Sequence, residues 1–226
     1  ADPFSVSLHG AARHPPPPDG RVLVWGAGAL GLSAVAALRT LHPDVEVGVV
    51  ARFDAQAAWA RCLGAHRVFP VTAPAEAVEV LAEWSGGVLR PTMDGLDGIP
   101  MCHPGGVDVV YDTIARPETL AVAVRVLRAR GTLVKSGVHP PARWEWSPLY
   151  FKEISWVGSN AFGVEEVEGV RRHAIDHYLA LTASGRVDLS GMVTHTFGLE
   201  DWRAAFAALA DQAASGAVKV ALDPSR

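Results

Sequence analysis

Residues 22–31 read Val22-Leu23-Val24-Trp25-Gly26-Ala27-Gly28-Ala29-Leu30-Gly31. An apolar run typical of a strand is followed at once by the pattern G-x-G-x-x-G, which opens a helical stretch. In this context Gly26 allows a tight turn, Gly28 lets the backbone approach a diphosphate, and Gly31 lets the helix pack closely on the strand. Unpaired N–H groups at the helix start then face the phosphates. The stretch predicts a dinucleotide-binding unit; the alternatives are a glycine-rich turn without a ligand and a methyltransferase-type loop.

The composition argues against several other classes of protein. The 226 residues are 49% hydrophobic, in short runs separated by Gly and Pro, which predicts a globular core. No run reaches the roughly 18 apolar residues that span a membrane. A net charge of −4 without a basic stripe argues against nucleic-acid binding. The only cysteines, Cys62 and Cys102, favour a cytoplasmic protein without disulfides, and Cys62 is expected to be buried on a helix.

Apolar strands and helices alternate along the first two thirds of the chain. Strands are expected at Arg21–Trp25, Val45–Val50, His66–Val71, Val107–Ile114, Thr132–Val138 and Ile154–Val157. Helices are expected at residues 1–14, from the glycine turn to about Leu41, from Asp54 to about Gly64, from Pro74 onward, and from Pro117 to Gly131. This order predicts an α/β fold, with a doubly wound parallel sheet of six strands covered by helices on both faces.

Three parts are predicted along the chain. Residues 1–19 form a helical lead-in and a Pro-rich tether, residues 20–163 the dinucleotide-binding domain, and residues 164–226 a C-terminal segment that packs on another part of the protein. The expected elements of this segment are a long helix at Glu165–Leu181, a strand at Val193–Phe197, a helix at Asp201–Ala214 and a strand at Val218–Leu222. Residues 85–106 form an irregular insertion. Its Cys102, His103, Asp94 and Asp97 fit no zinc spacing, which favours a flexible loop.

The end of the second strand bears on the choice of cofactor. A carboxylate about 20 residues after Gly31 would bind the 2′-hydroxyl of the adenosine ribose. The sequence instead has Ala51 followed by Arg52. A guanidinium pairs with a 2′-phosphate that a carboxylate would repel, so this pair favours NADP over NAD. The alternative is that Arg52 covers the adenine or lies in solvent, and either cofactor then binds.

Segments in order along nearly the whole chain resemble the zinc-dependent medium-chain dehydrogenases, the alcohol dehydrogenase family. They are Val22–Leu32, Leu63–Val68, Val107–Thr113, Gly131–Val134 with Ser136–Val138, Lys152–Ile154 with Gly158-Ser159, and Ser184–Leu189 with Val193–His195. The opening Asp2-Pro3-Phe4-Ser5-Val6 is similar to the polyol (sorbitol-type) branch. The resemblance implies the Rossmann domain of such an enzyme with its C-terminal segment, the catalytic domain lying mostly or wholly outside these residues.

The resemblance also implies roles for individual residues. Groups near Thr113, Val138 and Gly158, at strand ends, would face the adenine ribose and the nicotinamide, and Lys219 would either contact the pyrophosphate or be a solvated lysine. The predicted cofactor-binding residues are thus Gly26, Gly28, Ala29, Leu30, Gly31, Ala51, Arg52, Thr113, Val138, Gly158 and Lys219. Asp2 is a candidate zinc ligand by resemblance, but it needs three more ligands, and the family's other zinc ligands are not in this sequence. No catalytic residue is expected in this chain.

The implied activity is hydride transfer from an alcohol or polyol to NAD(P). Zinc would lower the pKa of the bound alcohol in the intact enzyme, and this domain would bind and orient the cofactor. Trp144, Trp146 and Trp156 predict an apolar patch in a region near the family's subunit interface, so a homodimer is expected. Two alternatives stay open. One is a zinc-independent quinone or enoyl reductase of the same superfamily, and the other is a non-catalytic dinucleotide-sensing module.

Overall fold

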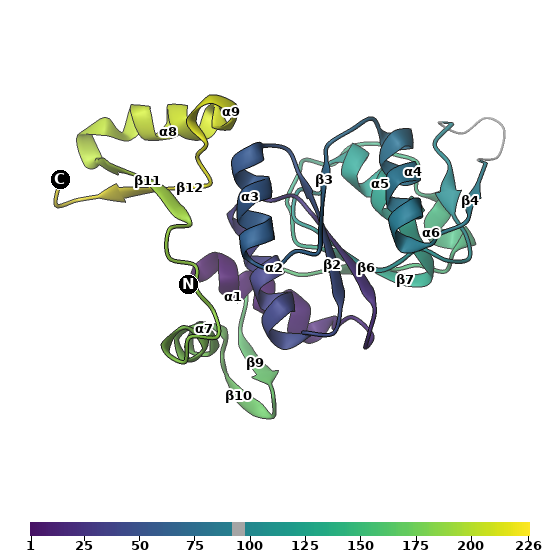
Figure 1. Ribbon diagram of the computed structural model, residues 1–226, viewed down its shortest axis with the longest axis horizontal. Coiled ribbons are helices and arrows are strands. Elements are labelled where there is room, and N and C mark those ends of the chain that lie inside the picture. Colours follow the sequence, from purple (N-terminus) through teal and green to yellow (C-terminus); the bar gives the residue numbers. More distant parts are fainter. Residues whose placement is uncertain (92–97) are drawn as a thin grey trace.

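A six-stranded parallel sheet forms the centre of the molecule (Figure 1). The structure, a computed structural model, describes residues 1–91 and 98–226. The strands are β1 (Arg21–Trp25), β2 (Glu46–Ala51), β3 (Arg67–Pro70), β6 (Val107–Asp112), β7 (Leu127–Lys135) and β8 (Ser155–Gly158), in the order β3-β2-β1-β6-β7-β8. Every neighbouring pair is parallel. The predicted doubly wound sheet is confirmed, with the strand order of a dinucleotide-binding Rossmann fold.

Helices cover both faces of the sheet, because successive side chains of a strand point to opposite faces. Val22 and Val24 of β1 pack with α2 (Ala29–Leu41) and α3 (Asp54–Cys62). Leu23 and Trp25 pack in a second cluster with α4 (Pro74–Ser85) and α5 (Pro117–Val126). Since both faces are covered, residues 22–25 of β1 form a continuous buried apolar run rather than an alternating one.

The N-terminal helix belongs to the packed body of the molecule. Helix α1 (Asp2–Arg13) is one residue shorter at each end than the helix predicted at residues 1–14. Its Phe4 and Leu8 are buried in a third apolar cluster with residues of α2 and α7 (Ala174–Ala183). The rings of Phe4 and Tyr178 lie 5.1 Å apart. Helix α1 therefore connects the sheet domain to the C-terminal part of the chain.

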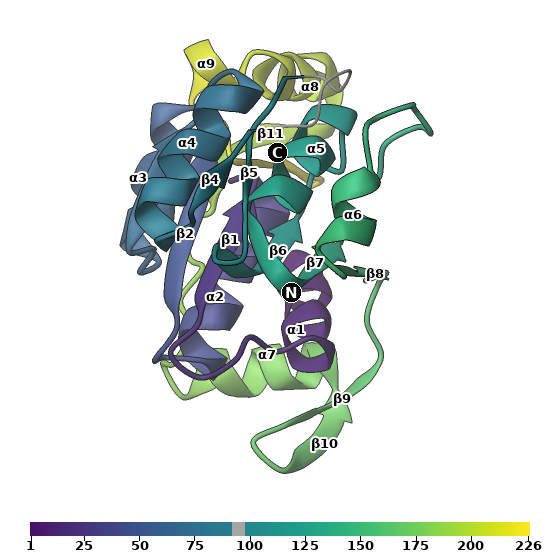
Figure 2. The ribbon, with the colours of Figure 1, turned by 90° about the vertical axis from the view of Figure 1, so that its right-hand side faces the viewer.

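The prediction of one long helix over Glu165–Leu181 is wrong. Residues 164–173 form an antiparallel hairpin of β9 (Val164–Val167) and β10 (Val170–His173), and only α7 follows as a helix. The cause is the two-residue turn, in which Glu168 and Gly169 both have positive φ, +52° and +76°. Two left-handed residues in succession are typical of the tight turn that joins hairpin strands. Figure 2 shows this hairpin projecting away from the sheet.

The helix predicted to run from Pro117 to Gly131 ends earlier than expected. Helix α5 stops at Val126, and β7 begins at the next residue. The Lys152 Nζ atom donates hydrogen bonds to the carbonyls of Val124 and Arg125, at 2.9 Å each, and so satisfies the end of the helix. Strand β7 ends at Lys135, three residues before the predicted strand end at Val138. The N–H groups of Ser136 and Gly137 both donate hydrogen bonds to the Asp112 carbonyl, which ends the strand.

The predicted insertion at residues 85–106 is not wholly irregular. Strands β4 (Leu89–Arg90) and β5 (Met101–Cys102) pair antiparallel within it. Asp94 and Asp97 lie outside the described residues. The expectation for Cys62 is also wrong: this thiol is exposed at the end of α3, whereas Cys102 is buried, and neither forms a disulfide.

The last elements form a small unit beside the sheet domain. They are β11 (Val193–Gly198), a 3-10 helix (Leu199–Asp201), α8 (Trp202–Ala210), α9 (Gln212–Ser215) and β12 (Lys219–Asp223). The remaining helix, α6 (Ser147–Phe151), belongs to the sheet domain and precedes β8. Strands β11 and β12 pair in parallel, and α8 lies along them (Figure 1). Within the described part of the chain, no helix has the length and hydropathy needed to cross a bilayer.

Candidate cofactor-binding site

A cleft of about 860 Å³ opens where β1, β2 and β6 end. Its walls are the glycine turn at residues 26–31, the residues that follow β2, the loop after β3 and the loop after β6. Ligands of open α/β sheets bind outside the carboxyl ends of the strands, where the strand order reverses. Strand β1 is that point, since β2 lies on one side of it and β6 on the other.

The three glycines of the turn have different surroundings. Gly26 has φ +100°, a conformation that favours glycine. A Cβ atom on Gly31 would lie 1.9 Å from the Gly26 carbonyl oxygen, so only glycine allows the helix to approach the strand. A Cβ on Gly28 would meet nothing within 4 Å. The space beside Gly28 is therefore open for a ligand to approach the backbone.

The start of α2 is available to an anion. Gly28 is its N-cap residue; no side chain caps the helix, and its first turn contains no acidic residue. Both Ala29 and Leu30 line the cleft. The first N–H groups of a helix have no partner within the helix, and they carry a partial positive charge. This end of α2 thus suits a diphosphate, so the residues present fit a dinucleotide.

A buried carboxylate holds the loop after β6 in place. Asp112 is fully buried and accepts hydrogen bonds from the N–H groups of Ile114 (2.9 Å) and Ala115 (2.8 Å) and from the Thr119 hydroxyl (2.7 Å). Burial raises the pKa of the Asp112 carboxyl above its ordinary value, although these donors act in the opposite direction. The Thr113 hydroxyl donates to the Trp25 carbonyl at 2.8 Å, which joins this loop to the end of β1.

The structure brings most of the predicted cofactor-binding residues to one place. Gly26, Gly28, Ala29, Leu30, Gly31, Arg52 and Thr113 all line the cleft. Ala51 is buried at the end of β2, immediately before Arg52. The Arg52 guanidinium is exposed and lies over the Phe53 ring, 5.2 Å from its centroid.

Three other predicted residues do not line the cleft. Val138 is 91% exposed beyond β7, and Gly158 ends the edge strand β8. Lys219 begins β12 and lies near the N-terminus of the chain. The pKa of the Ala1 amine is lowered mainly by burial and, second, by the positive charge of the Lys219 ammonium group. The structure therefore does not bring these three positions into the cleft that the other predicted residues line.

Other residues of the cleft were not predicted from the sequence. Phe53, Thr72 and Arg116 lie in the loops that follow β2, β3 and β6. Their positions just after predicted strands could have identified them as cleft residues. Ala210–Ala213, between α8 and α9, also line the cleft. Their placement depends on the C-terminal unit folding back beside α3, where Gly216 approaches Ala55, and no local pattern predicts such a contact.

Asp2 is the one candidate zinc ligand predicted in this chain. Asp2 is exposed in the first turn of α1. Among the described residues, no three His, Cys, Asp or Glu side chains lie close enough together to hold a metal ion. The chain's described residues therefore do not fit a zinc centre by themselves.

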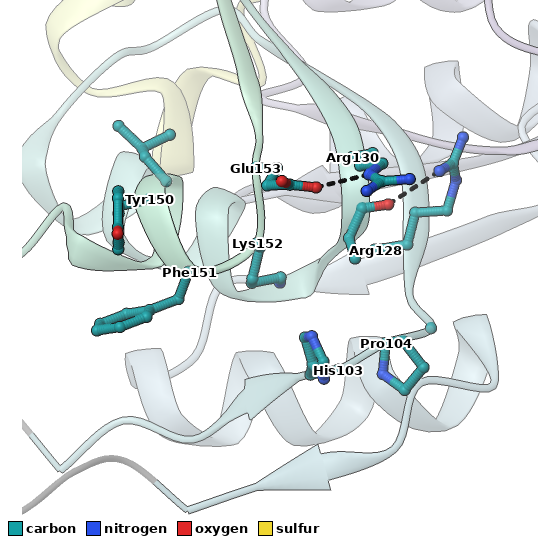
Figure 3. Close-up of a pocket in the computed structure, with 11 residues that line it drawn as sticks. His103, Pro104, Arg128, Arg130, Tyr150, Phe151, Lys152 and Glu153 are labelled. Atoms are coloured by element: carbon teal, nitrogen blue, oxygen red, sulfur yellow. Dashed lines mark hydrogen bonds and ion pairs between the residues drawn. The ribbon is translucent and has the colours of Figure 1, made fainter.

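Figure 3 shows a second cavity, of about 1070 Å³. It is lined by residues at the start of β7 and the end of α6, with His103 and Pro104. Its two arginines already have carboxylate partners: Arg130 pairs with Glu153 at 2.6 Å, and Arg128 pairs with Asp108 at 2.5 Å. This cavity lies at the amino ends of β6 and β7, so it is not the place where such a sheet binds a nucleotide.

The sheet order, the glycine turn and the cleft above it define a dinucleotide-binding domain of the Rossmann type. The chain belongs to the zinc-binding dehydrogenase family, whose profile matches residues 29–176.

Curated relatives and solved structures agree with this family. The chain is 26% identical to D-arabinitol dehydrogenase 1 of Uromyces fabae over 99% of its own length and 57% of the relative's. It is 26% identical to a sorbitol dehydrogenase of Arabidopsis thaliana over 97% of its length and 54% of the relative's. The chain spans a little over half of each of these relatives.

Two solved structures share the fold. One is 2R,3R-butanediol dehydrogenase from Bacillus subtilis, with TM-score 0.73 and 21% identity over 99% of this chain and 56% of that one. The other is a zinc-binding dehydrogenase from Sinorhizobium meliloti bound to NADP, with TM-score 0.70 and 25% identity over 99% and 58%. Both cover the C-terminal segment as well as the sheet domain.

Proposed function

We propose that this chain is the cofactor-binding part of an NAD(P)-dependent alcohol or polyol dehydrogenase. The observation that carries the proposal is the uncapped start of α2, which opens beside Gly28 into the cleft. The names of the relatives, a D-arabinitol dehydrogenase and sorbitol dehydrogenases, support an alcohol or polyol as the substrate of the whole protein. They also favour this activity over a zinc-independent quinone or enoyl reductase.

The chain's own residues bind and orient the cofactor. The N–H groups at the start of α2 hold the diphosphate, and Gly28 allows its close approach. Asp112 fixes the loop that carries Thr113 and Ile114, which gives the adenosine half a rigid wall. When bound, the nicotinamide would accept the hydride that leaves the carbinol carbon of the alcohol.

Arg52 favours NADP as the cofactor. Its guanidinium lines the cleft and has no ion-pair partner within residues 1–91 and 98–226, so it is available to a 2′-phosphate. We propose that ligands outside the described residues hold the zinc of the whole enzyme, and that Asp2 is the one candidate ligand that this chain could add.

The C-terminal segment, residues 164–226, packs on the catalytic domain in this proposal, with residues 1–19 as the lead-in and 20–163 as the cofactor domain. Support comes from the exposed apolar side chains of α8, among them Trp202 and Phe206.

The whole protein forms a homodimer through the region of Trp146, Trp156 and the edge strand β8, where the Trp156 ring also contacts Trp144. Two free thiols agree with a cytoplasmic location.

Calorimetric titration of the 226-residue chain with NADPH and NADH tests the function. We expect NADPH to bind more tightly, and Arg52→Asp to reverse the preference, because a carboxylate repels the 2′-phosphate and accepts a hydrogen bond from the 2′-hydroxyl. The chain alone is expected not to oxidise alcohols. Absence of binding by either cofactor contradicts the proposal, as does an Arg52→Asp variant that binds NADPH as well as the wild type does.

A further inference from the structure

The cofactor cleft contains a second arginine in addition to Arg52. Arg116 lies four residues beyond the end of β6, is the N-cap residue of α5, and is exposed where it lines the cleft. Several arginines elsewhere in the molecule, such as Arg21, Arg128 and Arg186, pair with carboxylates. Within the described ranges neither Arg52 nor Arg116 has such a partner, so both guanidinium groups are available to a ligand.

The sheet order places these arginines on either side of the glycine turn. Strands β2 and β6 both pair with β1, which runs directly into Gly26. Neighbouring strands lie about 4.8 Å apart, so the ends of β2 and β6 are separated by about 10 Å. Arg52 follows the end of β2, and Arg116 follows the end of β6. An anion bound between the two strand ends therefore lies within reach of a long side chain from each side.

The overall charge of the cleft would not by itself select a phosphate. Glu118 and Asp211 line it together with the two arginines, so the four charged side chains sum to zero. A phosphate monoester carries between about −1.5 and −2 charges near pH 7, and a single guanidinium offsets only part of this. Two planar guanidinium forks, each donating two parallel hydrogen bonds, match its three terminal oxygens.

We propose that Arg116 and Arg52 together clamp the 2′-phosphate of NADP(H), and that Arg116 is a specificity-determining residue of this domain. The inference rests on the proposed function, since it requires a dinucleotide in the cleft. It differs from a second role that the same position allows, in which the Arg116 guanidinium stacks on the adenine ring. Stacking would strengthen the binding of NADPH and NADH equally, because both contain adenine.

Calorimetry on the 226-residue chain separates these roles. The ligands are NADPH, NADH, adenosine 2′,5′-bisphosphate and AMP, and the variants are Arg116→Gln, Arg52→Gln and the double variant. Arg203→Gln is the matched control, because Arg203 is an exposed arginine of α8 that lies over the Trp202 ring and outside the cleft lining. We expect Arg116→Gln to weaken NADPH and the bisphosphate about 10- to 100-fold. Binding of NADH and AMP should change less than about twofold, and the control should change nothing.

Arg116→Lys is a second variant that keeps the charge and loses the fork, and its loss of NADPH affinity should be smaller than that of Arg116→Gln. Equal weakening of NADPH and NADH by Arg116→Gln would overturn the clamp and leave the proposed function intact. Unchanged NADPH binding in Arg116→Gln would do the same. A wild-type chain that binds none of the four ligands would overturn the proposed function and the clamp together. Thermal unfolding of each variant shows whether it is folded.

Discussion

Strand β1 of the sheet domain and helix α8 of the C-terminal unit differ in how far their apolar side chains are buried. In β1, the side chains of Val22, Leu23 and Val24 are completely buried, because helices cover both faces of the sheet. In α8, Phe206 is 63% exposed and Trp202 is 45% exposed. The core of the sheet domain is buried and includes Met192 and Val218 of the C-terminal segment, whereas α8 presents apolar side chains outward. Substitutions in the two regions should therefore differ in their effect on the free energy of unfolding.

The largest effect is expected for Gly31→Ala in the sheet domain. The new methyl group would lie 1.9 Å from the Gly26 carbonyl oxygen, a backbone atom that cannot move without shifting the turn. We expect a loss of about 3 kcal/mol in the free energy of unfolding, or failure to fold. Chemical denaturation followed by circular dichroism measures it.

Gly28→Ala is the matched control in the same turn. No atom lies within 4 Å of the added Cβ, and the φ of −77° suits alanine. Stability should stay within about 0.5 kcal/mol of wild type, while NADPH binding should weaken at least about tenfold because the methyl group occupies the diphosphate's approach. Similar stability losses in both variants would refute the close-approach role of Gly31.

A pH-dependent effect is expected at Lys152, which links α5 to the edge of the sheet. Its side chain is buried, and burial lowers the pKa of the ammonium group from 10.5 to about 7. Between these values the unfolded chain binds more protons than the folded one, so stability should rise with pH. We expect the free energy of unfolding to increase from pH 7 to pH 8.5, and Lys152→Met to flatten this increase. Equal slopes in the two proteins would contradict it.

The sequence predicts the sheet domain better than the C-terminal part for a physical reason. Around Gly26, strand propensity, glycine placement and helix start all indicate the same structure, and the fold agrees with each of them. At residues 164–173 the apolar positions suit a helix as well as a hairpin, and the left-handed turn at Glu168 and Gly169 decides between them. Part of the cleft shows the same limit: the strand-end residue Arg52 was predicted, whereas Ala210–Ala213 come from a distant segment.

The hairpin turn gives a smaller effect within the C-terminal part. Gly169→Ala places a side chain at φ +76°, a conformation that costs an L-residue about 1 kcal/mol. No neighbour lies within 4 Å of the new Cβ, so strain is the only cost. We expect a lower thermal midpoint and faster proteolysis within residues 164–173. Gly163→Ala, just before the hairpin and without a positive φ, should leave both unchanged.

The smallest effect on stability is expected for Phe206→Ser on α8. The ring is mostly exposed and forms a T-shaped pair with the Trp202 ring, with 6.1 Å between the centroids. Removing it should change the free energy of unfolding by less than about 0.5 kcal/mol, yet it should reduce binding of a hydrophobic dye, because it removes part of an exposed apolar patch. Leu120→Ser on α5, whose side chain is buried in the sheet-domain core, should instead destabilise strongly. If Phe206→Ser costs as much as Leu120→Ser, the outer face of α8 is part of the core of this chain, and the contrast between the two regions fails.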